Sequence, residues 1–212
     1  MNTIVLIKEK KTSKKKLLRN SASFMRSSNG EIRSWNWSYE MNAKIRHETD
    51  RDYRGITEVN DLGFGQKNEG QLILRLRETR KFIPELSLVA EIESRIVGHI
   101  LFYPIEIKSD DQVFPSLALA PMAVLPESQK QGIGSQLVRE GLKRARDLGF
   151  KSAIVLGHAA YYPRFGFEPA SRWGIRPPFD VPDDVFMALE LVKDALKDIQ
   201  GTVEYPPEFN DV

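Results

Sequence analysis

Apolar residues recur with two different periods in the first part of the body of the chain. A short apolar run at 43–47 suits a strand, and the polar cluster at 49–52 places a carboxylate three residues after a threonine, a helix-opening pattern. Apolar residues then repeat at helical spacing over 53–59, and a second amphipathic helix is predicted over 69–82.

The remaining pattern alternates β-rich runs with one long amphipathic helix, predicted over 134–148 and followed by Gly149 at the position of a left-handed C-terminal cap. A hairpin at 91–95 separates the first two strands, and the extended pattern resumes after Pro104. Strands are predicted over 86–90, 96–103, 116–125, 153–156 and 186–191. The order is strand, two helices, three strands, helix, strand, short helix, strand, which predicts an α/β domain with a mixed sheet.

The composition is that of a globular protein of moderate charge. The 212 residues are 41% hydrophobic and 28% charged, with a net charge of +2, so a surface that binds nucleic acid throughout is not expected. Cysteine is absent, which excludes disulfides, cysteine nucleophiles, zinc–thiolate sites and iron–sulfur clusters. The histidines at 47, 99 and 158 have no metal-ligand spacing, so no metal is expected.

The charge is unevenly distributed. Residues 1–40 hold nine Lys or Arg and three Glu, a balance of +6, which leaves −4 for residues 41–212. We therefore separate a basic N-terminal extension, 1–40, from a domain, 41–212. The extension is interpreted as a solvated terminus, with binding to an anionic surface or nucleic acid as the alternative. Alternating aromatic residues at 35–39 would let part of it form a strand, and Met41 is an alternative natural start.

The N-terminal apolar stretch, 3–7, is too short to cross a bilayer, and its basic residues follow it, the reverse of a secretory signal. No later run approaches the length of a transmembrane helix. These features predict a cytoplasmic protein that does not enter the membrane.

The loop between the strand at 116–125 and the helix at 134–148 has the chemistry of an anion site. Gly132 and Gly134 let the main chain approach a ligand, and they lie at a helix N-terminus, where free N–H groups and the helix dipole face an anion. Leu137 stands where a nicotinamide-binding fingerprint needs a small residue, and the Gly-Lys-Ser/Thr of a P-loop is missing. A glycine turn that merely joins strand to helix is the structural alternative.

Two segments together carry a family resemblance. Gln129-x-x-Gly132-x-Gly134 resembles the acetyl-CoA motif of the GNAT superfamily of N-acetyltransferases. About thirty residues further on, 161–167 (Tyr-Tyr-Pro-Arg-Phe-Gly-Phe) is similar to the aromatic-Tyr-x-x-x-Gly-Phe segment of that family. The resemblance covers about 42–192, and the residues after 192 look like the tail of a bacterial GNAT subgroup.

The resemblance implies a GNAT-type fold: a mixed, mostly antiparallel sheet flanked by helices, with a bulged fourth strand that splays from the fifth. It implies acetyl-CoA as co-substrate. The implied pantetheine donors are the amides of Met122, Ala123 and Val124. The implied diphosphate donors are the amides of the loop, namely Gln129, Lys130, Gln131, Gly132, Ile133, Gly134 and Ser135.

The catalytic assignments follow from the second segment. The resemblance implies that Tyr162 is the general acid that protonates the departing thiolate, whereas Tyr161 is expected to pack inward. His158, after the fifth strand, is a tentative general base, with a surface or loop-bonding histidine as the alternative. Asp183 and Asp184 could attract a cationic acceptor, although paired loop acids are usually only solvated.

The predicted function is transfer of an acetyl group from acetyl-CoA to a primary amine, of a small molecule or a protein, by direct transfer in a ternary complex. The alternative is a non-catalytic CoA sensor or protein-interaction module of the same fold. A nucleic-acid-associated role through residues 8–19 is a third, less favoured hypothesis. A homodimer is compatible with such a fold, and the sequence does not choose the amine.

Overall fold

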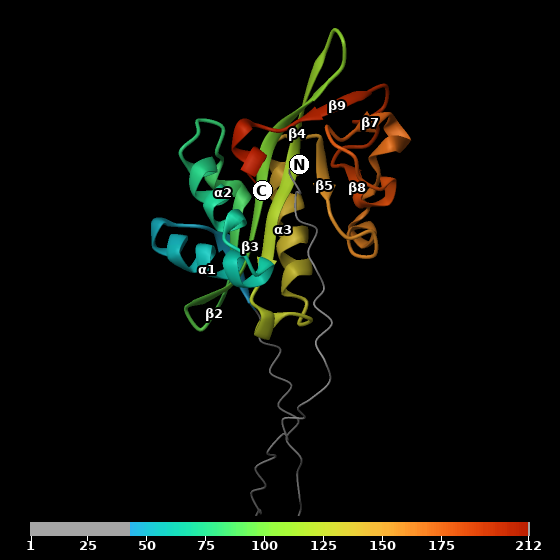
Figure 1. Ribbon diagram of the computed structural model, residues 1–212. Helices are drawn as coiled ribbons and strands as arrows, with labels where there is room; N and C mark the ends of the chain where they lie inside the picture. The colour runs from blue at the N-terminus through green and yellow to red at the C-terminus, as the bar shows by residue number, and fades with distance from the viewer. Residues whose placement is uncertain (1–42, 212) are drawn as a thin grey trace, which may run out of the picture. The chain divides into compact units, whose positions relative to one another are not determined.

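The computed structural model describes residues 43–211 (Figure 1). The predictions for the basic extension 1–40, and for Met41 as a start, lie outside the described residues.

The N-terminal elements are strand β1 (Lys44–His47), helix α1 (Tyr53–Phe64) and helix α2 (Asn68–Arg77). The helix-opening pattern is confirmed, because the N–H and Oγ1 of Thr49 both donate to Oδ2 of Asp52, at 2.7 and 2.9 Å. α2 ends five residues earlier than predicted. The Thr79 hydroxyl bonds the Leu76 carbonyl at 2.7 Å and the Tyr103 hydroxyl at 2.6 Å, and both contacts hold the chain in a turn that leaves the helix.

The predicted strands and the long helix are all present. They are β2 (Ser87–Ile92), β3 (Arg95–Lys108), β4 (Val113–Val124), α3 (Ile133–Asp147), β5 (Ser152–Leu156) and β8 (Phe186–Glu190). Three short strands were not predicted: β6 (Glu168–Pro169), β7 (Ile175–Arg176) and β9 (Gly201–Glu204). Single 3₁₀ turns lie at 50–52, 84–86, 126–128, 162–165, 170–173, 183–185 and 207–211.

The sheet has the order β1-β2-β3-β4-β5-β8-β6, and β9 pairs with the far end of β3 and with β7. The pairs are antiparallel except β4 with β5 and β7 with β9, which are parallel. The predicted mixed, mostly antiparallel GNAT-type sheet is therefore confirmed.

Strand alternation divides the core between the two faces of the sheet. On β3, Ile100 and Phe102 belong to the cluster that α3 covers, whereas Leu101 and Tyr103 belong to the cluster that α2 covers. Further along β3, Ile105 and Ile107 face the segment 170–203. The face opposite α3 thus has two covers, α1 with α2 and the C-terminal segment (Figure 1).

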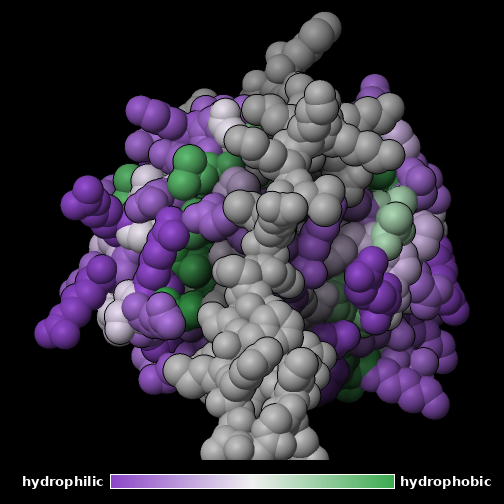
Figure 2. Space-filling model, turned by 90° about the horizontal axis from the view of Figure 1, so that it is seen from below, coloured by the Kyte–Doolittle hydropathy of each residue, from purple (hydrophilic) through white to green (hydrophobic). Residues whose placement is uncertain are grey.

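Between the grey atoms, the side seen from below in Figure 2 is mostly hydrophilic, with small separate hydrophobic patches. Among residues 43–211, the large exposed apolar side chains are Leu62, Leu74, Val113, Leu148 and Val192, and they lie on different segments. No helix formed by these residues is both long and apolar enough to cross a bilayer. The homodimer stays a prediction.

Candidate functional site

β4 and β5 diverge after a short parallel pairing. They are in register at only two pairs, Leu117 with Ala153 and Ala118 with Ile154, and then separate towards the end at which α3 begins (Figure 1). On its other edge β4 carries a bulge, because two residues separate Leu119 from Met122 where β3 has one. The bulge and the splay expected for the fourth strand are both confirmed. Within residues 43–211, the end of β4 therefore has one edge without a neighbouring strand.

The ladder between β3 and β4 decides which groups face that open edge. The Leu125 N–H donates to the Val97 carbonyl at 2.9 Å, and the same register pairs Ala123 with His99 two residues further on. Hydrogen-bonded pairs alternate along an antiparallel ladder, so the N–H of Ala123 faces β3.

The residues on either side of Ala123 face the other way. By the same alternation, the main-chain groups of Met122 and Val124 point to the open edge. The side-chain amide of Gln129 donates to the Val124 carbonyl at 3.0 Å, in agreement with this direction. The geometry narrows the expected pantetheine donors from three residues to Met122 and Val124.

The loop before α3 and the first turn of that helix hold a run of unpaired main-chain donors. Among residues 43–211, no hydrogen bond is formed by the six N–H groups from Lys130 to Ser135, and the first satisfied donor of the helix is Gln136, bonded to the Gly132 carbonyl at 3.0 Å. Lys130 and Gly132 have positive φ angles of 63° and 83°, which turn successive amides inward. Such a concave row of donors at a helix N-terminus suits a phosphate group.

Two glutamines shape this loop with their side chains. Gln131 donates through Nε2 to the Glu127 carbonyl at 3.1 Å, and Gln129 holds Val124 as above. The main-chain N–H of Gln129 donates to the Pro126 carbonyl at 3.4 Å, so it is less available than its neighbours as a donor to a diphosphate. The exposed Lys130 adds a cation to the donor row.

Tyr161 lies over the start of α3. Its hydroxyl is 3.4 Å from the Ser135 hydroxyl, and a Cβ at position 134 would lie 3.0 Å from its oxygen, so only glycine fits there without a shift. The guanidinium of Arg164 lies 4.7 Å from the ring centroid and brings a second cation towards the loop. Tyr161 packs on the main core cluster, as expected, but it is only half-buried and its hydroxyl reaches the helix terminus.

Tyr162 is the buried member of the pair, with 3% of its surface exposed. Its ring packs edge-on against Phe167, with centroids 5.7 Å apart, and a Cβ at Gly157 would overlap it. Burial, and to a lesser degree the neighbouring Tyr161, raises the pKa of the Tyr162 phenol. Its hydroxyl has no hydrogen-bond partner among the described residues and yet is not fully enclosed, so it keeps some access to solvent.

His158 begins the turn after β5. Its carbonyl accepts the N–H groups of Tyr161 and Tyr162, at 2.9 and 3.4 Å, so it fixes the start of the tyrosine segment. The side chain is half-buried, and its Nε2 is enclosed with no partner among the described residues. Asp183 and Asp184 are exposed and lie on a 3₁₀ turn beside this segment, because the Gly157 N–H bonds the Val185 carbonyl at 2.9 Å.

A buried polar network lies under α1 and α2, on the strand that supports β4. Arg77 holds Glu48 with two bonds of 2.6 and 2.9 Å. Ser87 donates to Glu48 at 2.5 Å and is 3.0 Å from Nε2 of His99. Nδ1 of His99 lies 3.2 Å from the side-chain nitrogen of Asn60. No sequence pattern indicated this network, because its members are far apart in the chain.

Comparisons with known proteins find similar chains. Residues 44–170 match the family of acetyltransferase (GNAT) domains. Over 140 residues the chain is 41% identical to the uncharacterised N-acetyltransferase YjhQ of Escherichia coli K12, covering 65% of this chain and 77% of YjhQ. Over 167 residues it is 34% identical to the uncharacterised N-acetyltransferase YhbS of the same strain, covering 78% of this chain and 98% of YhbS.

Solved structures agree with the fold. The crystal structure of Escherichia coli YhbS in complex with CoA matches with a TM-score of 0.75 and 32% identity, over 80% of this chain and 93% of that one. A GNAT family acetyltransferase from Brucella melitensis, in complex with acetyl-CoA, matches with a TM-score of 0.65 and 32% identity, over 80% and 99%.

Proposed function

The chain belongs to the GNAT family of acetyltransferases, and from this membership we propose that it moves an acetyl group from acetyl-CoA to a primary amine by direct transfer in a ternary complex. The observation that carries the proposal is the row of six unpaired N–H groups from Lys130 to Ser135, in the loop before α3 and in the first turn of that helix. In this proposal, they bind the diphosphate of coenzyme A, together with Lys130.

In this proposal, the pantetheine arm of the co-substrate lies along the open edge of β4. The outward N–H and C=O groups of Met122 and the outward N–H of Val124 can pair with the amides of the pantetheine arm, much as a neighbouring strand would, whereas the Val124 carbonyl already accepts from Gln129. The arm then directs the thioester into the gap where β4 and β5 part.

Acetyl transfer needs a neutral amine and a protonated leaving thiol. An alkyl amine titrates near about 10 and a thiol near about 8.5, so both ends of the reaction need proton transfer. The raised pKa of Tyr162 keeps its phenol protonated and able to donate to the sulfur as the carbon–sulfur bond breaks. His158, through its unpartnered Nε2, takes the proton of the attacking amine in this scheme.

The test is cofactor binding by Gly134→Trp. The new side chain would fill the space between the loop and Tyr161, so the dissociation constant for acetyl-CoA should rise by about 100-fold, or about 2.7 kcal/mol. Calorimetry measures it, with Lys143→Trp, an exposed site on the same helix, as the control. Unchanged affinity would refute the loop as the diphosphate site.

A panel of amines, followed by release of free thiol, tests turnover separately. Release with at least one primary amine supports the transferase. Tight binding of acetyl-CoA with no release across the panel favours the non-catalytic CoA sensor.

A further inference from the structure

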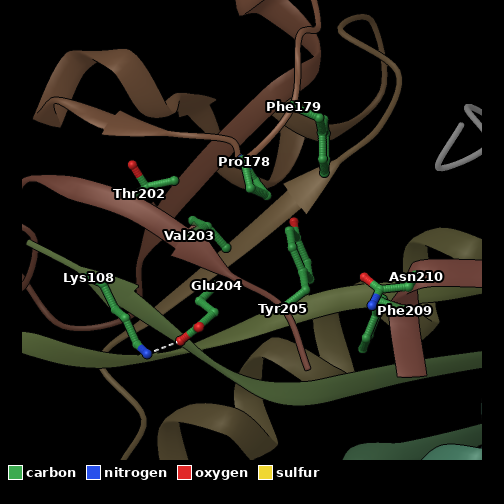
Figure 3. Close-up of a pocket in the computed structure, with 9 residues that line it drawn as sticks. All are labelled: Lys108, Pro178, Phe179, Thr202, Val203, Glu204, Tyr205, Phe209 and Asn210. Carbon is green, nitrogen blue, oxygen red and sulfur yellow. Dashed lines mark ion pairs between the residues drawn. The ribbon is translucent and has the colours of Figure 1, made fainter. Parts of the chain in front are cut away.

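A cavity of about 390 Å³ lies between the C-terminal segment and the end of β3 (Figure 3). Its walls come from 178–179, 202–205, 209–210 and Lys108. Nothing in the family motifs of the loop or of the tyrosine segment involves these residues. A cavity of this size holds a small organic molecule.

Aromatic rings dominate the wall. Phe179 and Tyr205 lie nearly parallel, with centroids 6.2 Å apart, and Phe209 packs on Tyr205 at 5.3 Å. The hydroxyl of Tyr205 points into the cavity, towards Pro178 and Phe179 (Figure 3), and it has no hydrogen-bond partner among residues 43–211. Apolar rings with one free hydroxyl suit a ligand that has an aromatic or branched apolar body.

The charged side chains of the cavity lining are one acid and one base. Among the described residues that line the cavity these are Glu204 and Lys108, whereas Asp180, Asp183, Asp184 and Glu208 lie on the same segments, 177–185 and 200–210, but outside the lining. The single basic residue of the lining is Lys108, and it forms an ion pair with Glu204 (Figure 3). Because this pair neutralises the charge of the lining, the aromatic faces are the groups that favour a cationic ligand.

Tyr205 connects the cavity with the gap between β4 and β5. It packs on the cluster that includes Ala118 and Ile154, the last registered pair of those strands. Tyr205 also packs on the cluster that includes Leu101 and Tyr103. Ala120, which lies in the bulge of β4, packs on the same cluster. Tyr205 therefore joins a cavity wall to the packing around the residues at which the strands part, on the face opposite α3.

We propose that this cavity binds the acceptor, and that the acceptor is a primary amine with an aromatic or branched apolar body. The body would lie against Phe179 and Tyr205, and the amine would reach the gap from the face opposite the diphosphate loop. That the bound amine is the acceptor rests on the proposed acetyl transfer. Binding of such an amine to the cavity does not depend on that function.

The probe is 2-phenylethylamine, with methylamine as the small amine and 2-phenylethanol as the uncharged analogue. For the full chain, kcat/KM from thiol release should be at least about 10-fold higher with 2-phenylethylamine than with methylamine, and calorimetry should show weaker binding of the alcohol. Phe179→Ala removes part of the cavity wall, and Thr202→Trp fills the cavity. Each should lower kcat/KM for 2-phenylethylamine about 10-fold. Acetyl-CoA affinity should not change.

The matched control is Val181→Ala, a half-buried residue of the same loop that does not line the cavity, and circular dichroism confirms folding of each variant. Equal kcat/KM in the wild type and both cavity variants would overturn the inference, as would a preference for methylamine. If acetyl-CoA does not bind, the proposed function fails. Calorimetry with 2-phenylethylamine alone then decides whether the cavity binds an amine. Binding that Phe179→Ala abolishes supports the cavity, and no binding refutes it.

Discussion

At the scale of single residues, Tyr161 and Tyr162 are neighbours in the chain with different surroundings. Tyr161 is half-buried and its hydroxyl lies beside Ser135, at the N-terminal end of α3. Tyr162 is buried and its hydroxyl lacks a partner among the described residues. The first is therefore placed to affect binding of the co-substrate, and the second to donate a proton.

We predict that Tyr162→Phe lowers kcat by about 100-fold, because removal of a general acid typically costs at least that much. Acetyl-CoA affinity should change little, since the ring and its packing on Phe167 remain. The measurement pairs steady-state kinetics with calorimetry. Tyr161→Phe is the matched variant, and its effect should appear in acetyl-CoA affinity instead. An unchanged kcat in Tyr162→Phe would remove the acid role.

The sequence predicts the chemistry of the loop better than the orientation of its groups. The glycines at 132 and 134 are visible as residue types, and so is the helix that follows them. The direction of the Ala123 amide is not, because it depends on the register of β4 against β3 across a bulge. The same holds for Tyr161, whose partner Ser135 is 26 residues away.

At the scale of elements, the long helix and the central strands could be predicted because each repeats one period over many residues. β9 could not, since four residues carry too little periodicity, and it is fixed by pairing with the distant β3. α2 ends early for a related reason, as the hydroxyl of Tyr103 on β3 helps to hold Thr79 in its turn.

Packing of α3 on the sheet gives a prediction at this scale. Gly141, within α3, faces the buried ring of Phe102, and a Cβ there would overlap the ring. In an open helix, Gly→Ala stabilises by about 1 kcal/mol, but overpacking a core costs about 1–3 kcal/mol. Gly141→Ala should therefore lower the free energy of unfolding, as measured by urea denaturation. Adding Phe102→Leu should recover part of the loss, and a more stable Gly141→Ala would contradict the packing.

At the scale of the whole molecule, the polar network joins the layer of helices α1 and α2 to the sheet beneath them. Arg77 comes from α2, Ser87 and His99 from neighbouring strands, and Asn60 from α1. Ser87 has one hydroxyl proton, which it gives to Glu48, so Nε2 of His99 must be the donor to Ser87. Nδ1 then accepts from Asn60, and a second proton on the ring would face an N–H group.

The free energy of unfolding at acid pH should therefore depend on His99. Burial, with Arg77 nearby, lowers the pKa of His99 from 6.5 to about 3. Below about pH 6.5 the unfolded chain binds a proton on this residue and the folded chain does not. The stabilisation that comes from the neutral imidazole is therefore complete above that pH and is lost as the pH falls towards 3. The slope is at most about 1.4 kcal/mol per pH unit.

Urea denaturation between pH 4.5 and 8 measures this slope, with His99→Gln as the comparison, because an amide keeps a donor and an acceptor but does not titrate. The pKa of Asp52, which its hydrogen bond with Arg46 lowers from 3.8 to about 2, affects stability mainly below this range. The unfolding free energy of the wild type should fall more steeply with acid than that of His99→Gln. Parallel curves would mean that the network opens to admit a charged imidazole, and the locked arrangement of Asn60, His99 and Ser87 would be wrong.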